Sequence, residues 1–280
     1  MNWLITGGGG QLASDLQELL GDRARSFSRA ELDITDSAAL DRAYDEVKPD
    51  VVVNCAAFHN VDVCEAEPDA AWACNVRAVR DIAQRGPKLV HLSTNYVFDG
   101  ERAKPYGEDD VPNPGSVYAI TKLAGEFCAL AYGDDPLVIR AAGLYGLHGS
   151  VSKGGNFVER MTARAKETGQ IKMVDDQLLQ PTFTADLAAA ILDAVERDAT
   201  GLVHLTAEDD CSWFRFTQKF LELQGVDAEL EPVQTTVAPG QPARPLNGVL
   251  ARPRADAIGL PRLPSWQDGL KRYLEARDAA

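Results

Sequence analysis

The chain has no apolar run long enough to cross a bilayer and no excess of positive charge. Of its 280 residues, 28 are Lys or Arg and 42 are Asp or Glu, which gives a formal net charge of −14. A spanning helix needs about 20 consecutive apolar residues, and nucleic acid and anionic membranes repel a polyanion. The sequence therefore argues against a membrane protein and against a nucleic-acid partner. The apolar start of the chain also lacks the basic flank of a signal peptide.

Close pairs of metal ligands and paired cysteines are also missing. The five cysteines form no C-x-x-C pair, and the four histidines share no ligand-like spacing. Zinc sites are usually built from such pairs, so no metal site is predicted; magnesium held by scattered carboxylates stays open. An odd number of unpaired cysteines is typical of a reducing compartment. We therefore expect a cytoplasmic protein, either a monomer or a homodimer.

What the sequence does contain is an alternation of short apolar runs with longer amphipathic ones. We expect strands at residues 1–6, 24–28, 51–57, 88–94 and 137–142, and helices at 11–20, 37–47, 69–84 and 117–132. Continuous Val/Ile/Leu strands with helices between them are typical of a parallel sheet covered on both faces. Right-handed crossovers make such a sheet doubly wound. The predicted fold class is therefore α/β, with a Rossmann-type doubly wound parallel sheet.

Beyond residue 143 the alternation loosens. We expect a glycine-rich loop at 146–155, helices at 156–166, 185–197 and 213–223, a strand at 202–206 and a proline-rich extended segment at 238–245. This pattern predicts that residues 1–146 form a dinucleotide-binding domain, to which segments near 171–206 return. Residues 147–170 and 207–280 are predicted to form a smaller, mostly C-terminal α/β lobe that binds the substrate.

A run of four glycines lies between the first predicted strand and the first predicted helix. Gly7 and Gly10 fit the spacing G-x-x-G-x-x-G, with the small Ala13 at the third position. Glycine lets the chain turn tightly and lets a pyrophosphate approach the helix N-terminus. We therefore predict a dinucleotide site in which these glycines and the first helical residues, Gln11 and Leu12, contact the cofactor.

The end of the second predicted strand bears on the choice of nucleotide. An acidic side chain at this point would hold the ribose 2′-hydroxyl of NAD, but the strand ends in Ser28 and Arg29. A hydroxyl and a guanidinium suit a 2′-phosphate, which favours NADPH. The nearby Glu31 keeps NADH open. Asp33 is a candidate acceptor for the adenine amino group.

Tyr118 and Lys122 lie four residues apart on a predicted helix and therefore share one face. A neighbouring ammonium stabilises a phenolate and lowers the phenol pKa, so that the phenol exchanges a proton with a carbinol near neutral pH. Chance Tyr–Lys pairs are common on helices. The position of Thr94 favours a catalytic interpretation of this pair. Thr94 ends the fourth predicted strand, at the edge where doubly wound sheets bind ligands. A hydroxyl at this edge would donate to a substrate carbonyl.

Together with the glycine turn, the set of Thr94, Tyr118 and Lys122 resembles that of the short-chain dehydrogenase/reductase superfamily. Longer stretches are similar to one branch, the dTDP-4-dehydrorhamnose reductases and their nucleotide-sugar relatives. These stretches are L-D-I-T-D (32–36), P-D-V-V-V-N-C-A-A (49–57), S-T-N-Y-V-F-D-G (93–100), P-N-P (112–114), K-L-A-G-E (122–126), G-N-F (155–157), D-D-Q (175–177), Q-P-T (180–182) and R-P (252–253). The resemblance covers nearly the full chain.

The resemblance implies NAD(P)H-dependent reduction of the 4-keto group of a deoxysugar linked to a nucleoside diphosphate, as in dTDP-rhamnose biosynthesis. Tyr118 would protonate the oxyanion, and Thr94 would orient the carbonyl. Lys122 would hold the nicotinamide ribose and lower the Tyr118 pKa. The resemblance also implies cofactor contacts at Ile34, Ala56 and Ala57, and substrate contacts at Val61, Asn95, Phe98, Asn156 and Gln177.

The chain departs from the family pattern in three ways. Asn95 replaces an aspartate, and an amide holds a sugar hydroxyl but shuttles no proton. Gly143 stands where the family often has tryptophan, so we expect a wall of the sugar pocket to be lost and a different or bulkier sugar to fit. His59 and Asn60 replace small residues ahead of Asp62, and His59 is either a sugar contact or a loop residue.

Two other functions stay open at this point. A sugar-nucleotide 4-epimerase uses the same triad with a bound NAD, and a non-catalytic regulatory subunit binds a dinucleotide while it clasps an enzyme. A dehydratase is disfavoured, because it needs an acid and a base directly after Thr94, where this chain has Asn95 and Tyr96. Net consumption of NADPH separates a reductase from an epimerase.

Overall fold

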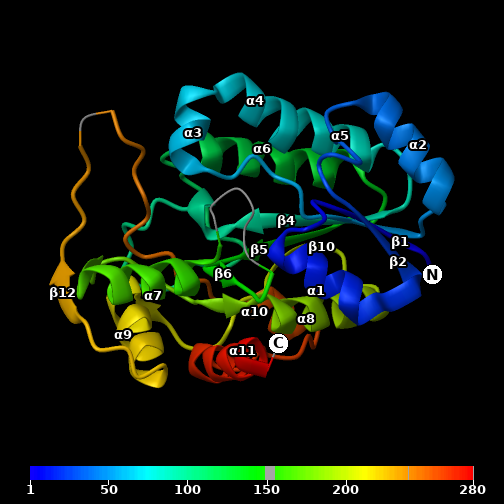
Figure 1. Cartoon of the computed structure of the whole chain (residues 1–280). Helices are drawn as coiled ribbons and strands as arrows, with labels where there is room; N and C mark the ends of the chain where they lie inside the picture. The colour runs from blue at the N-terminus through cyan, green and yellow to red at the C-terminus, as the bar shows by residue number, and fades with distance from the viewer. Residues whose placement is uncertain (149–154, 239, 280) are drawn as a thin grey trace.

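The computed structural model describes residues 1–148, 155–238 and 240–279. Its centre is a six-stranded parallel sheet in the order β10-β5-β4-β3-β1-β2 (Figure 1). The strands are β1 (Trp3–Thr6), β2 (Ala24–Phe27), β3 (Val51–Asn54), β4 (Lys88–Thr94), β5 (Leu137–Ala141) and β10 (Gly201–His204). The predicted doubly wound α/β fold is confirmed.

Helices cover both faces of this sheet, which is why β1 and β3 are buried along their whole length. One apolar layer packs against α1 (Gln11–Leu20) and α8 (Thr184–Glu196). The other packs against α2 (Ser37–Val47), α5 (Ala78–Ala83) and α6 (Val117–Tyr132), on the opposite side of the sheet (Figure 1). Successive strand residues alternate between the two layers, because side chains along a strand point to opposite faces.

The segment between β3 and β4 differs in detail from the helix predicted at 69–84. It contains α3 (Val61–Ala66), α4 (Pro68–Trp72), a π-helical segment (Ala73–Arg77) and α5. Asn75, in the π-helical segment, accepts from Phe58 N at 2.8 Å and donates to Thr121 Oγ1 at 3.0 Å. The buried amide therefore ties the loop after β3 to α6, the helix that carries Tyr118.

A second, smaller core lies at the side of the molecule where α7 and α9 are seen in Figure 1, and it extends to the C-terminal helix. Aromatic side chains dominate this core, and Tyr145, Phe216 and Tyr273 are almost fully buried in it. Its elements are β6 (Leu144–Tyr145), α7 (Phe157–Thr168), β7 (Gln170–Val174), β8 (Leu178–Leu179), β9 (Thr182–Phe183), β11 (Cys211–Ser212), α9 (Trp213–Leu223), β12 (Glu229–Val233) and α11 (Trp266–Ala279).

Two of the predicted domain limits need correction. β7 lies within the segment that was predicted to return to the dinucleotide domain, but it pairs with β12 in the smaller lobe. The returning segment is therefore α8 and β10, of which β10 pairs with β5. Part of the segment 207–280 also packs on the main sheet, because α10 (Pro253–Ala257) contributes Ala255 to the core under α1 and α8.

Residues 240–250, which we call the strap, connect the two parts of the molecule. On the lobe side, Leu178 donates its N–H to Leu246 O at 2.7 Å. On the sheet side, Asn247 donates to Gly100 O at 3.1 Å, and Tyr106 N donates to Val249 O at 2.9 Å. The predicted glycine-rich loop at 146–155 falls largely outside the described residues. Within the described part of the chain, no helix has the length and apolar character of a transmembrane span.

Candidate active site at the end of strand β4

The predicted catalytic hydroxyls meet at the carboxyl end of β4. Thr94 is the last residue of this strand, and its Oγ1 accepts a hydrogen bond from Tyr96 N at 3.2 Å. The Thr94 side chain also lies close enough to the phenol of Tyr118, in the first turn of α6, to influence its pKa. α6 begins at this point because Ser116 caps it by accepting from Ala119 N at 3.2 Å.

Tyr118 is held in a largely apolar environment. The ring of Tyr96 meets it edge-on, with 5.8 Å between ring centroids. Burial raises the pKa of Tyr118 to about 12, and the neighbouring Thr94 side chain offsets only part of this rise. The lowering of the Tyr118 pKa that we predicted from Lys122 is therefore contradicted in this arrangement. A phenol with a raised pKa stays protonated at neutral pH, which is the state a proton donor needs.

Lys122 lies one helical turn further along the same face of α6, and its side chain is buried. Its Nζ donates to Leu92 O in β4 at 2.6 Å and lies 3.4 Å from His91 Nε2. Burial lowers the pKa of Lys122 to about 8, and the negative charge of Glu126 opposes this lowering. The structure thus places an amine that titrates close to neutral pH beside the end of β4.

A buried ion pair fixes the rotation of α6. Glu126, one turn beyond Lys122, accepts two hydrogen bonds from Arg140 in β5, at 2.8 and 2.6 Å. Glu126 also accepts from Ser93 Oγ in β4. Both charged side chains are almost completely buried, at 3% and 1% exposure. Because the pair joins the helix to two strands, it holds the face that carries Tyr118 and Lys122 against the sheet.

The glycine turn leaves no room for side chains at Gly7 and Gly8. A Cβ on Gly7 would lie 2.9 Å from Ala56 N, and one on Gly8 would lie 2.6 Å from the Phe27 carbonyl carbon. Gly7 has a φ of +77°, which glycine adopts without strain. Gly10 has no side chain to cap α1, so the first amides of this helix face outward for an anion. Leu12 is buried, and only its backbone is available to a ligand.

A buried polar atom near the turn also suits a ligand. Gln11 Oε1 is buried and has no hydrogen-bond partner among the described residues. A hollow of about 430 Å³ beside the turn includes Gly8, Gly9, Ser28 and Glu31 in its lining. These observations fit the residues to a bound dinucleotide, with the phosphates at the turn and the adenosine toward the end of β2.

The end of β2 presents charges of both signs. The Ser28 N–H and hydroxyl both donate to Glu31, at 2.8 and 2.7 Å, which lowers the pKa of Glu31 to about 2. Arg25 also pairs with Glu31, at 3.1 Å. Arg29 extends into solvent with 81% of its side chain exposed, 3.9 Å from Asp33. Glu31, the residue that keeps NADH open as a cofactor, is thus an ionised neighbour of Ser28. The exposed Arg29 side chain is free to move toward a phosphate.

The remaining predicted cofactor residues lie in the segments that follow β2 and β3. Asp33 accepts from the N–H and the hydroxyl of Thr35, at 2.9 and 2.7 Å, which lowers the pKa of Asp33. Ile34 is buried in the apolar layer under α2. Ala56 and Ala57 follow β3, and Ala56 N donates to Thr6 Oγ1 at 3.3 Å. His59 Nδ1 lies 3.3 Å from Ala57 O.

Two predicted substrate residues lie beside the strap. Asn95 donates to Gly248 O at 3.0 Å, and Thr94 Oγ1 lies 3.4 Å from Asn95 Oδ1. Val61 begins α3, and its neighbour Asp62 pairs with Arg244 of the strap at 3.3 Å. The strap therefore borders the same corner as Thr94 and Tyr118, a feature that the sequence did not predict.

The structure contradicts two predicted substrate contacts. Phe98 is 1% exposed and stacks on Tyr106, with centroids 4.3 Å apart, so its ring is enclosed in the core. Asn156 is 2% exposed and caps α7, and its amide donates to Gly146 O and Tyr273 Oη, both at 2.7 Å. Both amide hydrogens are therefore already used.

Gln177, the last predicted substrate residue, is buried, and its amide donates to Thr235 Oγ1 at 2.9 Å. The expected enlargement of the sugar pocket at Gly143 is not found. A Cβ there would lie 2.8 Å from Leu179 Cδ1 and 3.0 Å from Pro181 Cα. The space next to this glycine is thus filled by the segment that contains β8 and the residues after it.

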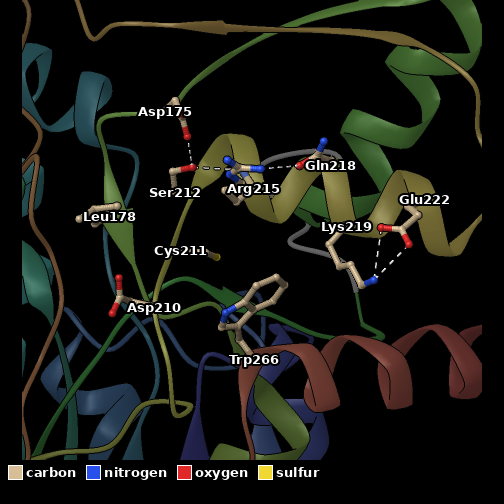
Figure 2. Close-up of a pocket in the computed structure, with 10 residues that line it drawn as sticks. All are labelled: Asp175, Leu178, Asp210, Cys211, Ser212, Arg215, Gln218, Lys219, Glu222 and Trp266. Carbon is tan, nitrogen blue, oxygen red and sulfur yellow. Dashed lines mark hydrogen bonds and ion pairs between the residues drawn. The ribbon is translucent and has the colours of Figure 1, made fainter.

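A hollow of about 510 Å³ lies in the smaller lobe, between β8, β11, α9 and Trp266 (Figure 2). Its polar side chains are engaged with one another: Ser212 with Asp175 at 2.5 Å, and Lys219 with Glu222 at 3.2 Å. None of the predicted catalytic residues lines it. We therefore place the candidate active site at the end of β4 and not in this larger hollow.

One cluster of potential metal ligands lies in the described part of the chain. Asp15, Glu18 and His148 bring potential ligand atoms within 4.8 Å of one another. His148 Nε2 lies 2.8 Å from Glu18 Oε1. The sequence gave no sign of this group, because its histidine lies 130 positions from the glutamate.

Comparison with known proteins finds similar proteins over nearly the full length of the chain. Residues 1–278 match the family described as RmlD substrate binding domain. A dTDP-4-dehydrorhamnose reductase from Streptomyces griseus is 39% identical, covering 96% of this chain and 91% of that protein. A dTDP-4-keto-6-deoxy-D-glucose reductase from Streptomyces niveus is 35% identical, with coverage of 96% and 94%.

A solved structure gives the same result for the fold. The crystal structure of a dTDP-4-dehydrorhamnose reductase from Bacillus anthracis, in complex with NADP, is similar with a TM-score of 0.92. The two sequences are 32% identical, and the match covers 99% of this chain and 100% of the other.

Proposed function

Because the chain belongs to the RmlD family, in the dTDP-4-dehydrorhamnose reductase branch of the short-chain dehydrogenase/reductases, we propose that it is an NAD(P)H-dependent sugar-nucleotide reductase. Its substrate is the 4-keto group of a deoxysugar linked to a nucleoside diphosphate, with dTDP as the nucleotide of the relatives. The observation that carries the proposal is that Thr94, at the carboxyl end of β4, lies close enough to the phenol of Tyr118 to influence its pKa.

The cofactor in this proposal is NADPH, which supplies the hydride when it is bound. Gly7 and Gly10 shape the turn for the pyrophosphate, and the open N-terminus of α1 favours its negative charge. At the end of β2, Arg29 is placed to reach a 2′-phosphate, while Glu31 disfavours one. NADPH is therefore preferred only modestly, and NADH remains usable.

Each catalytic side chain has one task. Tyr118 gives its proton to the oxygen of the sugar carbonyl, and its raised pKa keeps that proton available. Thr94 donates to the same oxygen and fixes its direction. Lys122 presents its side-chain nitrogen to the nicotinamide ribose, and its ammonium form stabilises the negative charge that develops on the oxygen.

The residues at the corner between β4 and the strap determine which sugar the enzyme accepts. Asn95 cannot act as an acid, because it is an amide, and its Nδ2 is already tied to Gly248 O. This supports reduction over dehydration, which needs a proton donor and a base at this point. The relatives named above differ in the 4-keto sugar that their names specify, so a panel of dTDP-4-keto-6-deoxysugars is the appropriate set of substrates.

We also propose that the enzyme works in a reducing compartment as a monomer or homodimer. Its five cysteines are free. Burial raises the pKa of the Cys55 and Cys211 thiols to about 12, which makes them slow to oxidise. Sedimentation of the purified protein measures the oligomeric state.

The test is the loss of NADPH absorbance at 340 nm with the substrate panel, for the wild type and for Tyr118→Phe. We expect the wild type to consume NADPH with at least one substrate, and Tyr118→Phe to lose about 100- to 10,000-fold in kcat, the usual contribution of a general acid. Cofactor binding is expected to be unchanged. Tyr132→Phe, on the exposed end of the same helix, is the matched control.

The outcomes separate the competing functions. Interconversion of 4-epimers without net NADPH consumption would indicate an epimerase. Tight NADPH binding without turnover on the whole panel would favour a regulatory subunit. Equal rates for Tyr118→Phe and the wild type would exclude Tyr118 as the proton donor.

A further inference from the structure

Three polar side chains lie side by side across the middle of the sheet. Thr6, Asn54 and His91 are direct neighbours on β1, β3 and β4. Two residues earlier on each strand, the same row is apolar and belongs to the layer under α6: Leu4, Val52 and Leu89. The polar row therefore points toward α6 as well, because strand side chains repeat every second residue. We call these three residues the polar rung.

The polar rung is fully buried, and its members are hydrogen-bonded in sequence. Thr6 and His91 are 0% exposed and Asn54 is 1% exposed. Thr6 Oγ1 lies 2.6 Å from Asn54 Oδ1, and Asn54 Nδ2 lies 3.2 Å from His91 Nδ1. Buried polar groups of this kind in the centre of a sheet are costly unless each one is satisfied.

The hydrogen bonds of the polar rung run in one direction, from Thr6 toward His91. Thr6 Oγ1 accepts from the N–H of Ala56, at 3.3 Å, and the Thr6 hydroxyl gives its own hydrogen to Asn54 Oδ1. The Asn54 amide then donates to His91 Nδ1. A neutral imidazole carries one hydrogen, which must therefore be on Nε2. Burial keeps His91 neutral by holding its pKa well below the ordinary value.

His91 Nε2 lies 3.4 Å from Lys122 Nζ. We propose that the polar rung is a positioning device for Lys122, in which the imidazole N–H faces the amine and weakens its hold on its proton. An N–H that faces an ammonium is a donor facing a donor, whereas a neutral amine accepts from it. The Leu92 carbonyl, 2.6 Å from Nζ, keeps the amine in place in either state.

Other ionisable groups face Lys122 from the elements packed around it. These are Glu126 on α6, Cys74 in the π-helical segment and Cys55 after β3. Glu126 favours the ammonium, but it is already paired with Arg140. Burial raises the pKa values of both thiols, which keeps them uncharged below about pH 9. The imidazole is thus the group among these that opposes the ammonium through an N–H.

The kinetic consequence of this inference rests on the proposed reductase activity. If the ammonium form of Lys122 serves the reaction, kcat/KM falls as the pH rises through the Lys122 pKa, and the polar rung sets the position of that alkaline limb. Removing the imidazole N–H raises the Lys122 pKa and moves the limb to higher pH.

The direct test is an NMR titration of lysine Cε resonances in the full-length protein, with Lys122→Met used to assign the signal. His91→Phe keeps the ring volume and removes the N–H. Asn54→Leu leaves His91 in place but frees Nδ1 to carry the proton, so that Nε2 accepts from the ammonium. We expect each variant to raise the Lys122 pKa by about one pH unit. The second variant keeps the test valid where the first fails to fold.

Thr217→Val is the matched control, since Thr217 is also a buried polar residue at 0% exposure but lies on α9 in the smaller lobe. It is expected to leave the Lys122 titration unmoved. An unchanged Lys122 titration in both rung variants, with normal turnover in the wild type, overturns the inference alone. A raised Lys122 pKa in a protein that turns over no substrate supports the inference and overturns the proposed function.

Discussion

Replacing Lys122 by methionine should make the protein more stable while it abolishes reduction. Burial lowers the Lys122 pKa from the ordinary 10.5 to about 8. At 1.36 kcal/mol for each pH unit, the folded state holds this charge at a cost of about 3 kcal/mol near neutral pH. Met fills a similar volume without a charge, but the Leu92 carbonyl loses its donor, which costs about 1 kcal/mol. The expected net gain at pH 7 is about 2 kcal/mol.

The stability difference between Lys122→Met and the wild type should change with pH in a defined direction. Below about pH 8 the amine is protonated in both the folded and the unfolded chain, so the full cost is present. Between about pH 8 and 10.5 the unfolded chain holds more protons, so the wild type gains stability as the pH rises. Above 10.5 the amine is neutral in both states and the cost is gone. The stability advantage of Lys122→Met should therefore shrink by about 3 kcal/mol over this window.

Urea unfolding of both proteins at several pH values measures the difference, in which all other titrating groups cancel. Lys172→Met, which removes a lysine whose side chain is 69% exposed, controls for the loss of one positive charge. A difference between Lys122→Met and the wild type that stays constant from pH 7 to pH 10.5 would refute the reasoning. It would mean that the folded protein accommodates the charged ammonium of Lys122 at no greater cost than water does.

Three further changes test the other parts of the site. Glu31→Gln should raise the preference for NADPH over NADH several-fold in initial-rate ratios, because it removes an ionised carboxylate beside Ser28; an unchanged ratio would contradict this. Gly8→Ala should weaken NADPH binding at least about tenfold in calorimetric titrations, since a Cβ would lie 2.6 Å from the Phe27 carbonyl carbon; binding equal to wild type would show that the turn yields. Glu126→Leu should lower the free energy of unfolding by about 3–5 kcal/mol by leaving Arg140 buried without its partner, and adding Arg140→Leu should restore most of it; a loss below about 1 kcal/mol in the single variant would count against the ion pair.

The sheet and the cofactor turn could be predicted from the sequence because both are local patterns. Continuous apolar runs such as V-V-V-N identify buried strands, and the four glycines lie where a strand turns into a helix. Tyr118 and Lys122 could be found for the same reason, since their spacing of four places them on one helical face. Thr94 followed from its position at a strand end.

The errors came from residues whose surroundings are set by distant parts of the chain. Phe98 follows the catalytic strand, but Tyr106 and Leu250 enclose it. Asn156 has the composition of a ligand contact, but its position at the start of α7 makes it a cap. Glycine at position 143 suggested an open pocket, but its neighbours 179–181 fill the space. Each outcome depends on contacts that no local pattern records.

The sequence contains a pattern that indicates the polar rung. Asn54 and His91 occupy positions two residues beyond Val52 and Leu89, where the strand alternation predicts a core-facing side chain. Polar residues at core-facing positions of adjacent strands predict a hydrogen-bonded group. Its connection to Lys122 could not be predicted, because it depends on how α6 is rotated against the sheet, and Glu126 and Arg140 fix that rotation.

The strap has a consequence for the order in which the enzyme is assembled during translation. Asn95 is hydrogen-bonded to Gly248, 153 positions later in the chain. At a synthesis rate of about 5–20 residues per second, the ribosome delivers that partner about 8–30 seconds after β4 has emerged. Throughout this interval the nascent chain can already form several parallel strands, while the corner beside Thr94 lacks one of its walls. The corner beside Thr94 is therefore completed only after the strap has been synthesised.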